Sequence, residues 1–299
     1  RAKAMIVCAI IIAMSLQGCA SKEQNSEETK KESLKETVAE SEVETETLLQ
    51  EDKRVMTYCD ASYYWHYMEI NENANPMKYD LSKFVKEDGF MTYEDDKYTY
   101  KTGIDVSKYQ DKIKWSKVNA MDIDFAYIRL GYRGYTKGDI FLDEKYEYNI
   151  KNASRSGMDV GVYFFSQAIN EEEAVEEAEF ILENIKDYQV EMPVVYDPET
   201  VQSSDARTKD ITKEQYTKNC IAFCEAIKEA GYEPMIYCNL IWEDKKLNMD
   251  ELKDYDIWYA DYAGLPQTPY DFTMWQYAED GIIDGISGGV DVDLWIVEK

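Results

Sequence analysis

The feature that most constrains the fold is a series of eight short apolar segments between Gly103 and Trp295. They read G-I-D-V-S, F-A-Y-I-R-L, V-G-V-Y-F-F-S, P-V-V-Y-D, P-M-I-Y-C-N, I-W-Y-A-D, F-T-M-W-Q-Y and G-V-D-V-D-L-W. Several are apolar at consecutive positions, which is typical of strands covered on both faces, as in parallel sheets. Because helical segments separate the early ones, the series predicts a parallel α/β barrel of the TIM type.

Helix signals lie between the early strands. Asn170 is expected to cap a helix whose apolar stripe repeats at helical spacing. Thr212 and Gln215 have the spacing of a capping box, before a helix over 213–230 that ends at Gly231. Shorter helices are expected over 144–156 and 115–120. The last two connections are short and rich in glycine or proline, so helices should be missing there and the barrel should be irregular.

Acidic residues recur where the predicted strands end. Asp197 and Glu199 follow a buried strand, and Pro198 between them suits the point where strand pairing stops. On an extended chain their side chains point to the same side, about 6.5–7 Å apart. Other strand ends carry Asp105, Asp261 and Asp291. Two carboxyl groups at one cavity are what the cleavage of a glycosidic bond requires, one protonated and one ionised.

Composition removes several function classes. The 299-residue chain has 60 acidic and 33 basic residues, a net charge of −27, which argues against nucleic acid as a partner. His66 is the single histidine. The chain therefore has too few histidines for a histidine-rich metal centre, and a Ser-His-Asp triad would depend on this one residue. Without a C-x-x-C pair a zinc site is also disfavoured. We therefore expect any acid–base chemistry to come from Asp, Glu or Tyr side chains.

The N-terminus has the pattern of an exported lipoprotein. A basic start and a short apolar run lead to Leu16-Gln17-Gly18-Cys19, which predicts a signal peptide over 1–18 and lipidation of Cys19. An ordinary secretory signal that contains a cysteine is the alternative. Residues 19–54 are rich in Glu, Ser, Lys and Thr, which predicts a disordered linker. Residues 55–101 predict a small Tyr-rich extension with some strand, before a barrel domain over 102–299.

With these residues in view, the chain from Gly103 to about Trp295 resembles glycoside hydrolase family 25, the lysozymes that cut peptidoglycan between N-acetylmuramic acid and N-acetylglucosamine. The resemblance rests on G-I-D-V-S, Y-I-R-L-G, G-V-Y-F-F-S, V-V-Y-D-P-E, I-W-Y-A-D-Y, M-W-Q-Y and G-V-D, in the family's order. It implies a flattened, irregular β/α barrel without a cofactor. Many members carry K-x-T-E-G where this chain has Arg129 to Gly134, which puts some substrate contacts in doubt.

The resemblance also implies roles by position. Glu199 is expected to be the general acid, and Asp197 the group that orients or stabilises the reacting centre. Asp105 and Asp291 are expected to complete the catalytic acids, although D-V-D leaves Asp293 open for the last position. Aromatic and polar residues at the strand ends are expected to contact sugars: Tyr163, Tyr237, Trp258, Asp261, Trp275, Gln276 and Arg129.

These observations predict a lipid-anchored, monomeric muramidase that acts outside the cytoplasm on peptidoglycan glycan strands and touches the membrane only through its anchor. Two alternatives stay open, a peptidoglycan-binding lipoprotein without catalysis and a hydrolase of another polysaccharide. The sequence leaves undecided whether Asp197 attacks directly or assists the substrate's own N-acetyl group. It also leaves open whose cell wall is cut.

Overall fold

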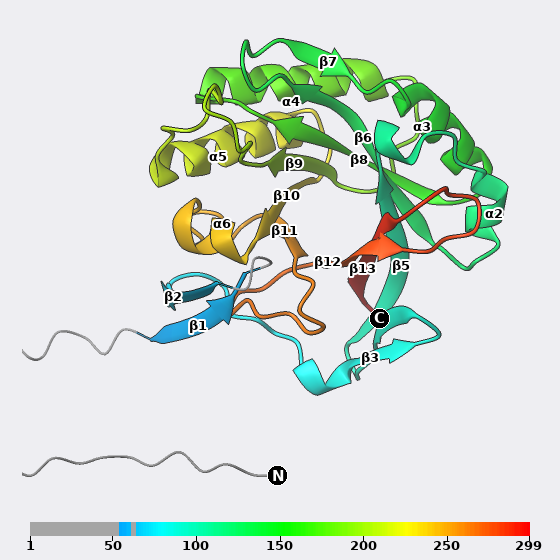
Figure 1. The fold of residues 1–299 in the computed structure, drawn as a ribbon, viewed down its shortest axis with the longest axis horizontal. Coiled ribbons are helices and arrows are strands. Elements are labelled where there is room, and N and C mark those ends of the chain that lie inside the picture. The colour runs from blue at the N-terminus through cyan, green and yellow to red at the C-terminus, as the bar shows by residue number, and fades with distance from the viewer. Residues whose placement is uncertain (1–53, 61–63) are drawn as a thin grey trace, which may run out of the picture. The chain divides into compact units, whose positions relative to one another are not determined.

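All eight predicted segments form strands in the computed structural model, which describes residues 54–60 and 64–299. The strands are β5 (Tyr98–Val106), β6 (Phe125–Arg133), β8 (Asp159–Ser166), β9 (Val194–Pro198), β10 (Pro234–Asn239), β11 (Asp256–Ala260), β12 (Met274–Gly281) and β13 (Val290–Glu298). They pair in the order β5–β13–β12–β11–β10–β9–β8–β6, and pairing of β5 with β6 closes the sheet into a barrel (Figure 1). A short strand, β7 (Ile140–Leu142), pairs with the end of β6.

The last strand corrects the prediction of an all-parallel barrel. From β5 through β6 to β12, neighbouring barrel strands run parallel, but β13 is antiparallel to both β12 and β5. Residues 282–289 alone separate β12 from β13. That connection is too short for the crossover that a parallel pair needs. The fold is therefore a mixed α/β barrel, in which β13 begins at the rim where the parallel strands end.

The predicted helices are present. They are α2 (Trp115–Asn119), α3 (Tyr146–Arg155), α4 (Glu171–Ile185) and α5 (Lys213–Glu229). The side chains of Asn170 and Thr212 cap α4 and α5 as expected, but Gln215 turns to Glu171 and Asn219 and leaves the second half of the capping box unmade. A short helix that the sequence pattern did not indicate, α6 (Leu240–Lys245), follows β10. In the described chain no helix lies between β11 and β13, as predicted.

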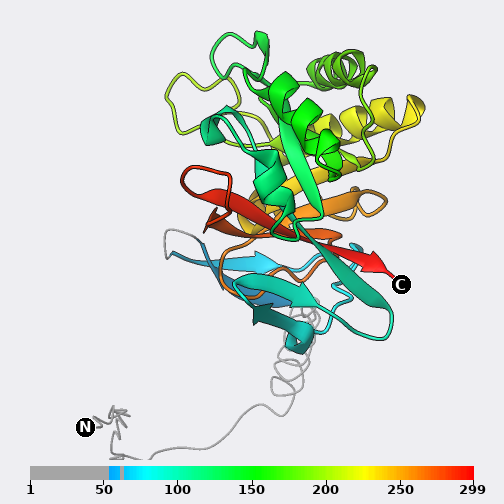
Figure 2. The same ribbon diagram turned by 90° about the vertical axis from the view of Figure 1, so that its right-hand side faces the viewer.

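Residues before the barrel form two antiparallel hairpins. In the first, β1 (Val55–Cys59) pairs with β2 (Trp65–Glu69), and in the second, β3 (Phe84–Glu87) pairs with β4 (Phe90–Tyr93). A 3₁₀ turn, η1 (Leu81–Lys83), precedes β3. Figure 2 shows the hairpins on the side of the barrel away from the long helices. Because β5 starts at Tyr98, one strand runs through the boundary expected between residues 101 and 102.

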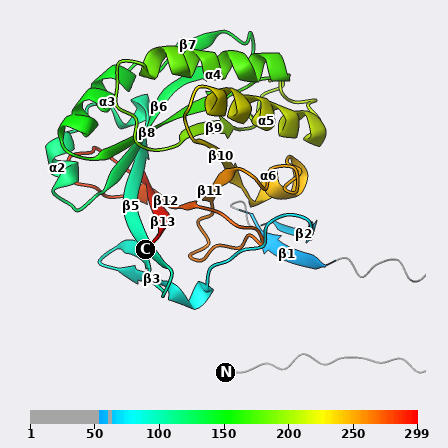
Figure 3. The ribbon, with the colours of Figure 1, turned by 180° about the vertical axis from the view of Figure 1, so that it is seen from behind.

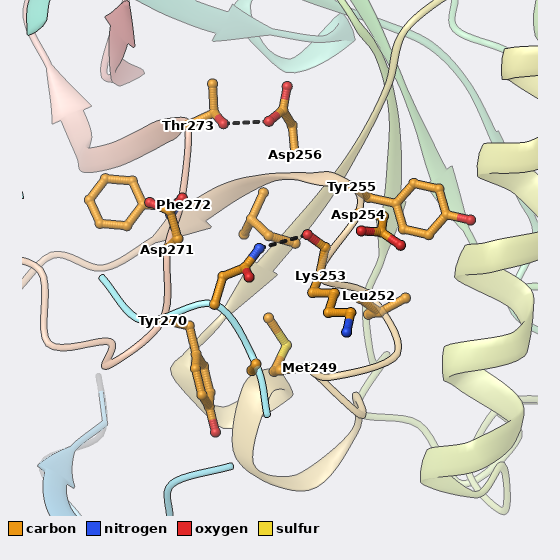
Figure 4. A pocket seen from close by; sticks show the side chains of 13 residues that line it. Met249, Leu252, Lys253, Asp254, Tyr255, Asp256, Tyr270, Asp271, Phe272 and Thr273 are labelled. Carbon is orange, nitrogen blue, oxygen red and sulfur yellow. Dashed lines mark hydrogen bonds between the residues drawn. The ribbon is translucent and has the colours of Figure 1, made fainter. Parts of the chain in front are cut away.

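Hydrogen bonds join this extension to the barrel beside a cavity of about 160 Å³, at the rim where β11 and β12 begin (Figure 4). Asn75 Nδ2 donates to the carbonyl of Lys253 at 2.7 Å, and the Tyr79 hydroxyl donates to the carbonyl of Phe272 at 2.8 Å. On the barrel side, the Thr273 hydroxyl donates to Asp256 at 2.7 Å. The strand ends that carry the predicted catalytic acids lie at the opposite rim.

The predictions for the N-terminal part of the chain fall outside this description. The signal peptide over 1–18, Cys19 and the acidic segment up to residue 53 lie outside the described residues. Within the described part of the chain, no helix combines the length and the apolar character needed to cross a membrane.

Aromatic rings fill the interior of the barrel below the acidic rim. Phe125 and Tyr127 meet edge to face with ring centroids 6.1 Å apart. The ring centroids of Tyr127 and Trp258 are 4.8 Å apart. Gly103 faces this cluster from β5, where a Cβ atom would lie 2.1 Å from the Phe125 ring. The glycine of G-I-D-V-S is therefore required by the ring on the neighbouring strand.

We expect Gly103→Ala to lower the free energy of unfolding by about 1–3 kcal/mol, the usual cost of overpacking a filled core. Gly134→Ala is the matched control, because its Cβ would meet its nearest neighbour, the Phe141 ring, at 3.4 Å. Urea denaturation of both variants measures the difference. Equal stability of the two variants would contradict the proposed role of Gly103.

Candidate active site

Alternation along the strands carries functional side chains to one rim of the barrel. On β6, Phe125 and Tyr127 face the interior, and Arg129 continues the same face towards the rim. On β9, Val195 faces the interior and Asp197 follows two residues later. Because successive side chains on a strand point to opposite faces, each inward residue near a strand end opens onto the same space.

The four predicted catalytic acids line one cavity of about 260 Å³. Asp105 on β5 and Asp291 on β13 are direct partners in the antiparallel register. Asp197 comes from the end of β9, and Glu199 follows Pro198, the last residue of that strand. Gln167 Nε2 donates to the Glu199 carbonyl at 2.6 Å and holds the chain where it leaves the sheet. The reversed direction of β13 explains why Asp291 stands at the start of its strand.

The electrostatics of the cavity raise the pKa of all four acids. Burial, followed by the charge of Asp291, raises the pKa of Glu199 to about 7. Burial, followed by Glu279, raises the pKa of Asp291 to about 6. Burial and neighbouring carboxylates also raise the pKa of Asp105 and of Asp197 well above the usual range. Enclosed like charges cannot all ionise at neutral pH, so the cluster contains both a proton donor and an ionised group.

Arg129 is the cation that faces this cluster from β6. Its Nε and one of its terminal nitrogens donate to Asp143 at 2.8 and 2.7 Å, which fixes the guanidinium. Its charge counters the effect of burial and lowers the pKa of both Asp197 and Glu199. The fixed guanidinium of Arg129 therefore offsets part of the repulsion among the carboxylates in the cavity.

A hydrogen-bond network centred on Gln276 orients another acid. Gln276 Nε2 donates to Asp105 at 2.6 Å, and its Oε1 accepts from the hydroxyls of Tyr237 at 2.8 Å and Tyr262 at 2.6 Å. These contacts fix the amide so that its donor faces the carboxylate. Tyr262 comes from the loop after β11, so the network also ties that loop to the cavity.

Asp291 and Asp293 occupy different levels of the barrel. Asp291 lines the cavity, whereas Asp293 is fully buried and accepts from Trp258 Nε1 at 3.0 Å. Trp258 itself lines the cavity and contacts Tyr163 and Tyr237 edge to face. The geometry favours Asp291 as the acid open to a substrate, with Asp293 beneath it holding the Trp258 ring.

Trp275 does not reach the cavity. Its neighbour Gln276 faces inward on β12, so Trp275 must face outward. It is fully buried between barrel and extension, where its ring contacts Phe84 and Tyr277 and its Nε1 donates to the Asp261 carbonyl at 2.8 Å. The prediction that Trp275 binds sugar is therefore wrong.

Asp261 lies outside the acidic cavity and lines a neighbouring one. Its carboxylate accepts from the Tyr259 hydroxyl and from the backbone N–H groups of Ala263 and Gln267, at 2.9 Å in each case. These bonds shape the loop after β11, and Asp261 is not among the residues that line the acidic cavity. Asp261 therefore positions Tyr262, while the other predicted contact residues, Tyr163, Tyr237, Trp258, Gln276 and Arg129, do line it.

Sequence reasoning missed several residues of the cavity: Ser107, Tyr109, Gln110 and Phe165. Ser107 begins the 3₁₀ turn η2 (Lys108–Gln110), in which its backbone N–H donates to Gln110 at 2.9 Å. Tyr109 remains largely exposed at the mouth. Ser107, Tyr109 and Gln110 follow directly after the end of β5, which carries Asp105. Their position beside that acid is the sequence signal that could have identified them.

The departure from K-x-T-E-G also has a structural account. Arg133 is buried away from the cavity, where it donates to Glu177 at 2.6 Å and to Glu176 at 2.8 Å. Both partners lie on α4, so this arginine fastens that helix to β6.

Across the described residues, no group of three or more His, Cys, Asp or Glu side chains is placed to hold a metal ion.

Comparisons with known proteins show which family the chain resembles. The family model of glycosyl hydrolases family 25 matches residues 104–286. The chain is 23% identical to an autolytic lysozyme of Clostridium acetobutylicum over 192 residues, which cover 64% of this chain and 54% of the relative. It is 28% identical to lysozyme M1 of Streptomyces globisporus over 200 residues, which cover 63% of this chain and 65% of the relative.

Among solved structures, the modular autolysin LytC of Streptococcus pneumoniae superposes with a TM-score of 0.61 at 25% sequence identity. The match covers 81% of this chain and 56% of LytC. LytC has also been solved in complex with a synthetic peptidoglycan ligand. The chain thus spans little more than half the length of LytC and of the clostridial lysozyme. Since the family model covers more than half of its residues and all eight barrel strands stand in place, this chain belongs to glycosyl hydrolases family 25.

Proposed function

We propose that the protein is a muramidase, which hydrolyses the β-1,4 bond between N-acetylmuramic acid and N-acetylglucosamine in peptidoglycan. The observation that carries this function is Glu199, whose pKa of about 7 leaves a proton on a carboxyl group inside a cavity shared with three further acids. Family membership and the lysozymes among its relatives support a glycoside hydrolase of this type.

In the proposed reaction, Glu199 donates its proton to the oxygen of the scissile bond as the bond to the sugar carbon breaks. Positive charge develops on the sugar and is stabilised by the carboxylate of Asp197, whose ionised form is favoured by the nearby charge of Arg129. Water then adds to the sugar carbon, and Glu199 recovers a proton from it. Asp197 Oδ1 is buried with no hydrogen-bond partner in the described chain, which leaves an acceptor for a polar group of the substrate.

The remaining cavity residues take supporting roles in this proposal. Asp105 completes the acidic cluster, and the charge of Asp291 helps to sustain the raised pKa of Glu199. Tyr163, Tyr237 and Trp258 present rings with polar tips, which suit the mixed apolar and hydroxyl surface of a sugar. Gln276 orients Asp105, and Arg129 holds the local charge balance.

The proposed setting is outside the cytoplasm, since the wall-lytic relatives act on a substrate found there. We further propose that Cys19 carries the lipid anchor and that residues 19–54 form a spacer before the catalytic unit, which acts as a monomer. The alternative of a wall-binding lipoprotein without catalysis is disfavoured by the four acids in one cavity.

Product analysis tests the function. Purified peptidoglycan is digested, reduced with borohydride and analysed by mass spectrometry for the sugar at each new reducing end. We expect reduced muramic acid in every new end. New ends that carry glucosamine would identify a different bond specificity, and the absence of new ends would leave only the binding alternative.

A further inference from the structure

The β1–β2 hairpin, outside the residues matched by the family model, is fixed to the barrel beside the acidic cavity. On its inner face Tyr58 and Met68 are buried, and the Tyr58 hydroxyl donates to Asp244 on α6 at 3.1 Å. The His66 ring stacks on the Tyr58 ring, with centroids 5.0 Å apart. His66 Nε2 lies 2.8 Å from Asp60 Oδ2. Figures 1 and 3, seen from opposite sides, both place the hairpin next to α6.

The outer face of the same hairpin presents aromatic side chains to solvent. Trp65 is 72% exposed and Tyr67 is 77% exposed, two residues apart on β2 and therefore on one face. Cys59 lies directly opposite Trp65 in the register. Large apolar rings that gather on one exposed face commonly mark a binding surface.

A second cavity lies between the hairpin and the acidic cavity. It has a volume of about 430 Å³, within the range of sites for small ligands. The hairpin contributes Tyr58, Cys59 and Asp60 to its wall. Tyr237 and Tyr262 line both this cavity and the acidic one, so the two spaces are adjacent. Cys59, which lines the second cavity, is the cross-strand partner of Trp65.

We propose that the hairpin and this second cavity form an additional glycan subsite, which holds sugars of the same strand beyond those at the catalytic acids. The proposal rests on the muramidase function proposed above. A strand that leaves the acidic cavity past Tyr237 and Tyr262 enters the second cavity and then meets the rings of Trp65 and Tyr67.

The chemistry of the surface selects a glycan as its occupant. Asn239 and Gln267 offer amide groups to sugar hydroxyls, and the rings offer apolar faces. The acids Asp60, Asp261 and Glu279 line the second cavity and disfavour the anionic headgroups of a membrane surface. Continuity with the acidic cavity favours the substrate strand over a second protein chain.

The test compares Trp65→Ala/Tyr67→Ala with Phe141→Ala, which removes an exposed ring from β7. Each variant is assayed on long glycan strands and on the shortest soluble fragment that contains one cleavable bond. For the double variant we expect KM on long strands to rise about tenfold, the loss typical of a well-placed aromatic contact. Its kinetics on the short fragment, and all kinetics of Phe141→Ala, should match the unsubstituted protein.

Binding separates this proposal from the proposed catalysis. In a Glu199→Gln background, the double substitution should weaken sedimentation with insoluble peptidoglycan by a similar factor. If the unsubstituted protein cuts peptidoglycan and the double variant keeps the same KM and binding, the subsite is overturned while the function stands. Equal losses on long and short substrates, or a loss confined to lipid vesicles or to self-association, would also overturn it.

Discussion

Replacing Glu199 with glutamine is expected to lower kcat on peptidoglycan by about 100- to 10,000-fold, the range that general acid catalysis contributes. Glutamine keeps the size of the side chain but has no acidic proton to give to the leaving oxygen. Binding should persist, because the cavity walls are unchanged. Release of reducing ends under saturating substrate measures kcat, and sedimentation with insoluble peptidoglycan measures binding.

Glu243→Gln is the matched control for this substitution. Burial raises the pKa of Glu243 to about 8, so it too is protonated at neutral pH, and its Oε2 accepts from Thr268 at 2.6 Å. It lies on α6 and lines neither the acidic cavity nor the proposed glycan subsite. Activity should stay near that of the unsubstituted protein. Loss of activity in Glu243→Gln equal to that in Glu199→Gln would show that the assay reports damage to folding.

Asp197→Asn is expected to reduce kcat by about 100- to 1,000-fold, the usual effect of removing one preorganised electrostatic contact to a transition state. The amide is close in size to the carboxylate but cannot carry the negative charge that opposes the developing charge on the sugar. KM should change little, since the lost interaction forms mainly in the transition state. Initial rates over a range of glycan concentrations separate the two parameters.

The comparison for this variant is Asp256→Asn, at the opposite rim of the barrel, where the carboxylate accepts from Thr273. We expect its kinetic parameters to be unchanged. An Asp197→Asn variant with full kcat would remove Asp197 from the reaction and leave its position beside Glu199 without a function.

The barrel strands were predictable because their burial pattern is strong. Runs such as P-V-V-Y are apolar at every position, and strands buried on both faces require this. The direction of β13 was not visible in its own residues. It follows from the length of the connection before it, and a parallel assignment to G-V-D-V-D-L-W disregarded that length. Helix α6 was missed because six residues carry too little periodicity.

The acids could be located in sequence because carboxyl groups are unfavourable at the end of a buried strand unless they have a task. The faces of single residues were harder to assign. Trp275 and Gln276 are adjacent, so one of them had to face away from the cavity, and no local signal says which. Asp261 satisfies the pattern of a strand-end acid, but its loop supplies two backbone donors that only the folded chain brings to it.

The central claim is that Glu199 keeps its proton near neutral pH inside the acidic cavity, and direct titration tests it. Carbon-13 NMR of the glutamate carboxyl groups, with the Glu199 signal assigned by its loss in Glu199→Gln, follows this group through the pH range. We predict a midpoint at about 7, with activity falling as pH rises through the same value because the proton donor is lost. A midpoint at about 4.3, the ordinary value for a glutamate, would contradict the account.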